Sequence, residues 1–123
     1  MKRTVLMLAF VVVAVLVAVP VAYAANFRCD EVPCLGTSQK DTIRERAGDG
    51  KRDIIRAKGA DDRIEAGRYG RDADRLYGQE GNDRLNALDG DGDDYLDGGP
   101  GLDLCAGDRG DRLSPQCEQR AIF

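Results

Sequence analysis

Aspartate recurs along the middle of the chain at spacings that could place carboxylates in rows. In eight segments an Asp is followed two positions later by Ile, Leu or Cys. These residues are Asp41, Asp53, Asp62, Asp74, Asp83, Asp94, Asp103 and Asp111. Carboxylate oxygens are ligands that Ca²⁺ prefers, in sets of about six to eight oxygens at about 2.3–2.6 Å. The chemistry that this pattern could support is the binding of a divalent cation.

The distances between successive aspartates define the repeat. They are 12, 9, 12, 9, 11, 9 and 8 residues, so long and short halves alternate for most of the series. A period of about 21 residues made of two unequal halves predicts two short strands and two turns in each coil. The fold class predicted is all-β: a short right-handed parallel β-roll or β-solenoid of about four two-strand coils.

The apolar residue after each Asp is expected to point into the core of this roll. The inward set is Ile43, Ile55, Ile64, Leu76, Leu85 and Leu96. Alternation along a strand places the neighbours of these residues, such as Arg44, Arg63, Tyr77 and Arg84, on the outer faces. A helix is disfavoured because Gly recurs every few residues and no segment keeps a 3.6-residue apolar period. A disordered Gly/Asp-rich chain would not explain the fixed position of the apolar residue.

Residues one coil apart should lie directly above one another. Asp62, Asp83 and Asp103 would then form one row, and Asp53, Asp74 and Asp94 would form another at the opposite edge. Two carboxylates about 5 Å apart repel by roughly 3 kcal/mol at an effective dielectric constant near 20. A cation between the coils would remove that cost. The competing interpretation is that Asp and Gly serve only as ordinary turn-forming residues.

The short turns resemble a known repeat. Residues 98–103 read Gly-Gly-Pro-Gly-Leu-Asp, which fits the start of the nonapeptide G-G-x-G-x-D-x-U-x, where U is a large aliphatic residue; residues 78–83 depart from it at one Gly. The sequence is similar here to the RTX, or haemolysin-type, calcium-binding repeat family. The resemblance covers residues 36–113 and is strong over 78–103. Long halves with two or three extra residues depart from the family's regular nine.

The resemblance implies calcium ions held between the turns of adjacent coils. The family pattern, carried over to this chain, makes Asp83 and Asp103 side-chain ligands, with carbonyl groups from Gly81, Gly99 and Gly101. A second site is expected in the acidic long turn. It would use Asp91, Asp93 and Asp94 against Asp74 or Asp72.

Charge divides the chain into two halves. Residues 25–77 contain 12 Lys or Arg against 11 Asp or Glu, whereas residues 78–123 contain 4 against 11. We therefore expect calcium in the C-terminal coils. In the N-terminal coils we expect ion pairs to neutralise the aspartate rows, which would make Asp41, Asp53 and Asp62 structural residues. The candidate cations are Arg52, Lys58, Arg63 and Arg71.

The four cysteines lie on either side of the repeats. Four cysteines allow three pairings, and sequence alone does not choose among them. Pairing Cys29 with Cys34 and Cys105 with Cys117 is favoured, because each bond would staple one end of the stack. A zinc site is the rival interpretation, and it is weak without any His.

The first 24 residues are expected to be a signal peptide. Lys2 and Arg3 precede an apolar run, and Ala22-Tyr23-Ala24 has the small-x-small pattern of a cleavage site. An uncleaved membrane anchor is the alternative, because the run approaches the roughly 20 residues that span a bilayer. Residues 25–37 would then form an N-terminal cap, 38–113 the β-roll and 114–123 a C-terminal cap.

These features together predict a secreted, extracellular calcium-binding repeat module that is not an enzyme. The alternative is a structural or adhesive β-solenoid that needs no metal and is capped by disulfides. Catalysis is not expected, because the chain has no His and its two serines, Ser38 and Ser114, lie near no base. Nucleic acid is disfavoured by the acidic net charge. The partners expected are calcium ions, an unidentified extracellular partner and, through the terminal coils, another copy end to end. No membrane span is expected after signal cleavage.

Overall fold

The computed structural model describes residues 25–29, 33–45, 50–67 and 71–123, and these residues form a stack of short strands without a helix. The signal peptide expected over residues 1–24 lies outside the described residues. The strands are β1 (Asn26–Cys29), β2 (Cys34–Leu35), β3 (Thr42–Glu45), β4 (Ile54–Gly59), β5 (Arg63–Glu65), β6 (Arg75–Glu80), β7 (Arg84–Ala87), β8 (Tyr95–Asp97), β9 (Leu104–Gly107), β10 (Arg112–Leu113) and β11 (Gln119–Ile122).

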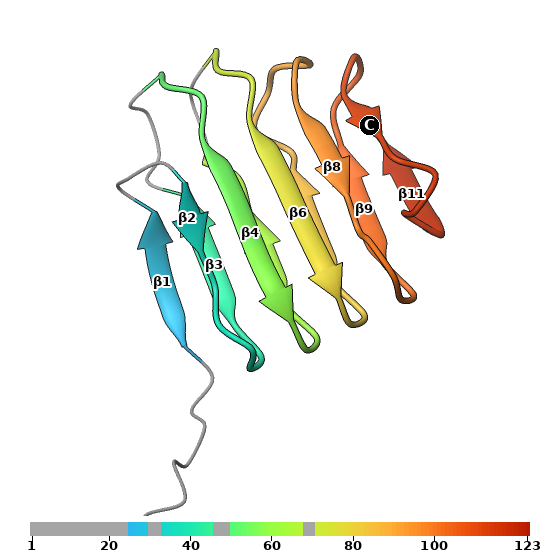
Figure 1. Ribbon diagram of the computed structural model, residues 1–123. Coiled ribbons are helices and arrows are strands. Elements are labelled where there is room, and N and C mark those ends of the chain that lie inside the picture. The colour runs from blue at the N-terminus through green and yellow to red at the C-terminus, as the bar shows by residue number, and fades with distance from the viewer. Residues whose placement is uncertain (1–24, 30–32, 46–49, 68–70) are drawn as a thin grey trace, which may run out of the picture.

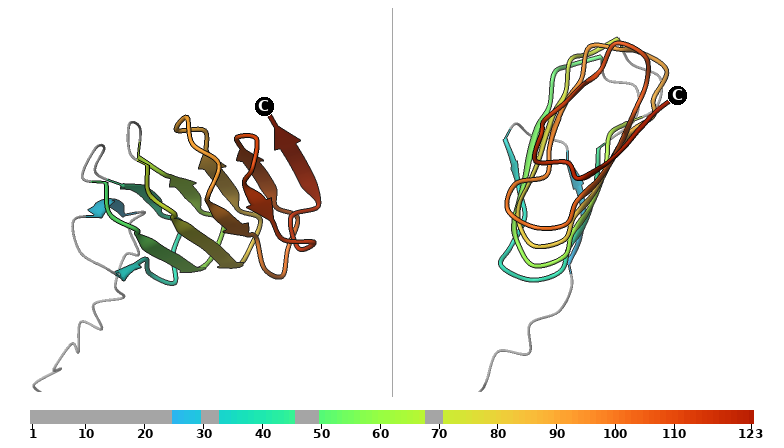
Figure 2. Two further views of the ribbon diagram at one scale, coloured as in Figure 1. Left: turned by 90° about the horizontal axis from the view of Figure 1, so that it is seen from above. Right: turned by 90° about the vertical axis from the view of Figure 1, so that its right-hand side faces the viewer.

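The strands form two parallel sheets that the chain visits in turn. Sheet A has the order β1-β3-β5-β7-β9-β11, and sheet B has the order β10-β8-β6-β4-β2. Viewed along the stack, the coils superpose as flattened rings (Figure 2). The short turns, which lead from sheet B to sheet A, lie along the lower edge in Figure 1, and the described parts of the long turns lie along the upper edge. The all-β parallel solenoid predicted from the repeat is confirmed.

The core consists of apolar side chains stacked in register between the two sheets. Ile43, Ile64, Leu85 and Cys105 follow one another in sheet A, and Ile55, Leu76, Leu96 and Leu113 in sheet B. All six inward residues predicted from the sequence are at most 1% exposed. Each strand is only a few residues long, so its stability depends on hydrogen bonds and stacking with the next coil.

Disulfides hold both ends of the stack. Cys29 is bonded to Cys34 and Cys105 to Cys117, which is the pairing favoured from the sequence. The segments predicted as caps carry strands of the sheets: β1 pairs with β3, β2 with β4, and β11 with β9. The described part of the chain contains no helix that is long and apolar enough to cross a membrane.

Candidate functional site

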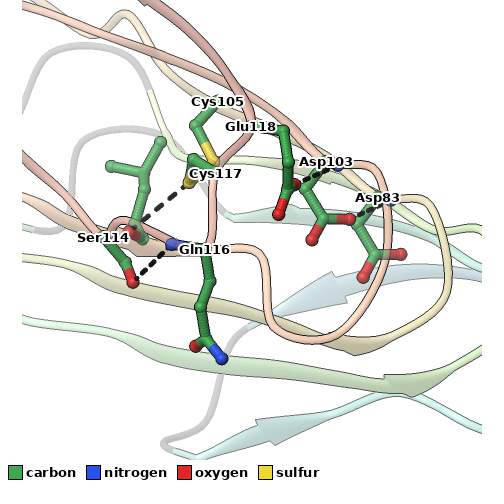
Figure 3. The surroundings of a disulfide bond; sticks show 8 residues. Asp83, Asp103, Cys105, Ser114, Gln116, Cys117 and Glu118 are labelled. Carbon is green, nitrogen blue, oxygen red and sulfur yellow. Dashed lines mark hydrogen bonds between the residues drawn. A yellow bond between two sulfur atoms is a disulfide. The ribbon is translucent and has the colours of Figure 1, made fainter.

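The aspartate that precedes each strand belongs to a hydrogen-bonded row. On the short-turn edge, the backbone N–H groups of Asp41, Asp62 and Asp83 donate to Oδ1 of the Asp one coil further on, at 2.6, 2.8 and 2.7 Å. The N–H of Asp103 donates to Oε2 of Glu118 at 2.9 Å. Figure 3 shows the carboxyl groups of Asp83, Asp103 and Glu118 following one another beside the Cys105–Cys117 bond.

An equivalent row runs along the long-turn edge. The N–H groups of Asp53 and Asp74 donate to Oδ1 of Asp74 and Asp94, both at 2.8 Å, and that of Asp94 donates to Oδ1 of Asp111 at 3.0 Å. Both rows predicted from the repeat spacing are therefore present. Each carboxylate aligns the backbone of two adjacent coils at the start of a strand, so one of its two oxygens has a structural role.

The other oxygen of most row carboxylates is buried without a hydrogen-bond partner. This holds for Oδ2 of Asp62, Asp74, Asp83, Asp94 and Asp103, and also for Oδ2 of Asp89. A buried charged oxygen without a donor is costly, because the lost hydration is not replaced. These oxygens are therefore available to a ligand that replaces the missing donors.

The carboxylates converge at the long-turn edge. In four overlapping groups of three, ligand oxygens lie within 4.8 Å of one another. The groups are Glu45–Asp72–Asp74, Asp72–Asp89–Asp91, Asp74–Asp89–Asp94 and Asp91–Asp94–Asp111. We call these seven residues the acidic column. In the group Asp74–Asp89–Asp94 each member also has a buried, unpartnered Oδ2.

The pKa values of the acidic column show the electrostatic cost of this arrangement. Burial, with added repulsion from Asp89, Asp111 and Asp74, raises the pKa of Asp94 to about 8. Burial and the nearby Asp74 raise the pKa of Glu45 to about 9. The pKa of Asp72 is raised to about 6, again by burial first and then by neighbouring carboxylates. The column therefore resists full ionisation unless positive charge is supplied.

The short-turn edge differs from the long-turn edge, because its successive turns are in direct backbone contact. Burial raises the pKa of Asp83 to about 7, with Asp62 and Asp103 adding to the effect. The turns are also tied directly to each other, because the Gly81 N–H donates to the Pro100 carbonyl at 3.2 Å. A Cβ on Gly101 would collide with the Gly81 carbonyl oxygen, and one on Gly99 would collide with the Gln79 carbonyl oxygen. The carbonyl groups of Gly81 and Gln79 thus face the next turn, whereas metal binding by the carbonyl groups of Gly81, Gly99 and Gly101 stays a prediction.

The structure distributes the predicted ligands between the two edges. Asp74, Asp91 and Asp94 belong to the acidic column, whereas the neighbouring Asp93 is exposed and lies outside its groups of three. Asp83 and Asp103 lie together in the short-turn row. Sequence reasoning missed three members of the column: Glu45, Asp89 and Asp111. The alternation Asp89-Gly90-Asp91-Gly92-Asp93 was the available signal for Asp89.

Arg63 does not neutralise the aspartate row of the N-terminal coils in the predicted way. Arg63 pairs with Glu65 at 2.6 Å, and Arg44 pairs with the same carboxylate at 2.6 Å. All three side chains belong to the outer face of sheet A, because side chains alternate between the two faces of a strand and Ile64 points into the core. Asp62, a row residue of these coils, keeps an unpartnered oxygen, and burial raises its pKa to about 6. The expected role of Arg63 is therefore wrong.

The donor set of the acidic column suits calcium. It consists of carboxylate oxygens, several of them buried and unpartnered, on turns that come from different coils. Ca²⁺ takes hard oxygen ligands in flexible geometry, whereas Mg²⁺ demands a near-ideal octahedron, and Zn²⁺ favours nitrogen and sulfur. All four cysteines are in disulfides, so no thiolate is offered.

Parallel coils with aspartate rows at both edges define a solenoid of the metal-binding repeat class. Comparison with known families agrees: the family described as RTX calcium-binding nonapeptide repeat (4 copies) matches residues 70–91 and 86–113. Residues 70–113 of this solenoid therefore carry RTX-type calcium-binding repeats. No curated protein and no solved structure matched the chain. The matched residues contain most of the acidic column, and also the two short turns that carry Asp83 and Asp103.

Proposed function

We propose that the protein is a secreted, non-catalytic module whose coils are completed by calcium ions in the acidic column. The group Asp74–Asp89–Asp94 carries this proposal. Its three carboxylates lie within ligand distance of one another, and each has a buried second oxygen without a donor. A cation bound there supplies the charge that burial and mutual repulsion demand. Asp83 and Asp103, with the turn carbonyl groups, remain the predicted ligands of a second site.

Export fits this chemistry. The two disulfides indicate an oxidising compartment, and calcium is abundant outside cells. Metal binding to a site that exists only in the folded chain contributes its free energy to folding. The chain would therefore remain weakly stable before export and become stable on meeting calcium.

A metal-independent, disulfide-capped scaffold is the second candidate. The disulfides at both ends, the stacked apolar core and the N–H to carboxylate bonds along both rows would support it. None of these interactions has an ion as a partner. The two candidates differ in what compensates the acidic column at neutral pH: a bound ion in the first, and protons retained on its most buried carboxylates in the second.

Far-UV circular dichroism of the oxidised chain, without residues 1–24, separates the two candidates. We expect a β signal and a cooperative thermal transition in millimolar calcium, and a much weaker signal or a lower midpoint in excess chelator. Magnesium at the same concentration is the control, and it should not replace calcium. Identical spectra and midpoints in calcium and in chelator would support the scaffold and overturn the calcium proposal.

A further inference from the structure

The outer face of sheet B carries tyrosines and arginines in alternation. In the register of the sheet, Tyr95 on β8 lies between Arg75 on β6 and Arg112 on β10. In the next column, Tyr77 on β6 lies between Arg56 on β4 and Asp97 on β8. We call Arg56, Arg75, Tyr77, Tyr95 and Arg112 the Tyr/Arg face. Side chains of alternate residues leave a strand on the same side, so all five project away from the core.

The two rings form one partly exposed platform. Their centroids are 5.9 Å apart with the planes inclined at 58°, and the guanidinium of Arg56 lies 5.7 Å from the centroid of Tyr77. Both tyrosines are only half-buried, so ring surface remains accessible to a ligand. Tyrosine rings supply flat contact area, and the phenolic hydroxyl remains free to hydrogen-bond.

Two arginines of this face are exposed beside carboxylates that do not pair with them. Arg75 and Arg112 are exposed and make no ion pair within the described part of the chain. The outer face of sheet A differs, because Arg44 and Arg63 there share Glu65. An exposed guanidinium offers paired donors to a carboxylate, which makes an anionic group the natural complement of this surface.

A hollow adjoins the platform. It has a volume of about 720 Å³ and is lined by Arg52, Arg75, Tyr77, Tyr95 and Arg112 together with Asp74, Asp93 and Asp94 of the long-turn edge. Sites of roughly 300–1,000 Å³ hold small organic ligands rather than single ions. The acidic rim disfavours a polyphosphate, which carries a charge on every unit and would meet Asp93 and Asp94.

We propose that the Tyr/Arg face binds a carboxylated polysaccharide in which a uronic acid alternates with a neutral sugar. Sugar rings would stack on Tyr77 and Tyr95, and carboxylates would pair with Arg75 and Arg112. These arginines lie two strands apart, and strand spacing in a sheet is about 4.8 Å, so they are about 10 Å apart along the stack. That distance is close to the length of a disaccharide, so alternate sugars would present a carboxylate to successive arginines.

Calorimetric titration with a hexasaccharide in which uronic acid alternates with a neutral sugar, in millimolar calcium to keep the chain folded, tests this proposal. We expect binding to the wild-type chain and no binding of a neutral glucose hexasaccharide. Arg75→Gln combined with Arg112→Gln should weaken binding about tenfold or more, because each charge-assisted hydrogen bond is worth about 1.5–3 kcal/mol. Tyr95→Ala should weaken it as well, whereas Tyr95→Phe should bind almost as the wild type does.

The matched control compares Arg75→Gln alone with Arg84→Gln, which removes one exposed arginine from the outer face of sheet A. Equal loss of binding in this control would overturn the proposal, because it would indicate attraction by net charge alone. Failure to bind the acidic hexasaccharide would overturn it too, as would equal binding of the neutral one or tighter binding of duplex DNA or anionic vesicles. If Tyr95→Ala does not fold, the arginine variants carry the test. Calcium titration of the same variants should keep its stoichiometry, which separates this proposal from the calcium site.

Discussion

Five row aspartates, Asp62, Asp74, Asp83, Asp94 and Asp103, use their two oxygens for different purposes. Oδ1 accepts a backbone N–H from the preceding coil, as in the 2.8 Å bond from Asp74 to Asp94, whereas Oδ2 is buried without a partner. An Asn at the same position could still accept that N–H through its carbonyl oxygen. Substitution by Asn therefore removes the charge and leaves the structural hydrogen bond, which makes it the suitable probe of metal binding.

Asp94→Asn should weaken calcium binding by about tenfold or more, because calcium affinity follows the number of charged ligands. The matched control is Asp93→Asn, which changes an exposed neighbour outside the groups of three. It should leave affinity within about twofold. Calorimetric titration with calcium measures both. An equal loss in the two variants would show that general acidity, rather than the acidic column, attracts the ion.

The raised pKa values predict how stability depends on pH without calcium. Asp94 and Glu45 have pKa values of about 8 and 9, well above those of the unfolded chain. Such groups stabilise the fold below their unfolded pKa, and this contribution is lost as pH rises through the folded pKa. The thermal midpoint of calcium-free protein should therefore fall from pH 5 to pH 8.

Calcium should reverse this trend, because only ionised carboxylates bind it. The increase in midpoint on adding calcium should grow from pH 5 to pH 8. Differential scanning calorimetry measures both effects, in buffer that a chelating resin has freed of divalent cations and in the same buffer with added calcium. A calcium-free midpoint that rises with pH would contradict the burial of these carboxylates.

The sequence predicted the two aspartate rows more fully than it predicted the members of the acidic column. The fixed Asp-to-apolar spacing was enough to place Asp62, Asp83 and Asp103 one above another, because successive coils must repeat in register. It could not show that Glu45, which lies at the end of a strand, reaches Asp72 and Asp74. That contact involves a long turn. Because the long turns differ in length from coil to coil, the spacing in the sequence does not predict which of their residues face each other.

At the scale of the elements, the short turns explain the glycines of the repeat. The second and fourth positions have positive φ in each of three turns. These residues are Lys58 and Ala60, Gln79 and Gly81, and Gly99 and Gly101. A non-glycine residue in this backbone region lowers the free energy of unfolding by roughly 1–2 kcal/mol, because its Cβ comes too close to the backbone. The N-terminal coils therefore keep the turn shape at the cost of strain, which explains how a degraded repeat still stacks.

Ala60→Gly should raise the free energy of unfolding by about 1 kcal/mol, since it relieves a φ of 78°. Gly101→Ala should lower it by more than that, because its φ is 156° and a Cβ would collide with the Gly81 carbonyl oxygen. Gly59→Ala is the control, because its Cβ would meet nothing within 4 Å and its φ is not positive. Urea denaturation in calcium measures all three. A Gly101→Ala variant as stable as Gly59→Ala would contradict the close contact of the turns.

At the scale of the whole molecule, charge is arranged by face as well as by position in the sequence. The excess of acidic residues after residue 78 predicted calcium in the C-terminal coils, and the acidic column is centred there. It also extends back to Glu45, a residue of β3 in the N-terminal half. Composition alone could not show this, because a solenoid brings residues about 21 apart into contact.

The most direct measurement of the calcium proposal is anomalous X-ray diffraction from crystals grown in millimolar calcium. We predict an anomalous peak enclosed by the carboxylates of Asp74, Asp89 and Asp94, at distances of about 2.3–2.6 Å from their oxygens. A further peak between the turns that contain Asp83 and Asp103 would be consistent with the second predicted site. Anomalous density confined to that second position, or absent from the long-turn edge altogether, would contradict the assignment of calcium to the acidic column.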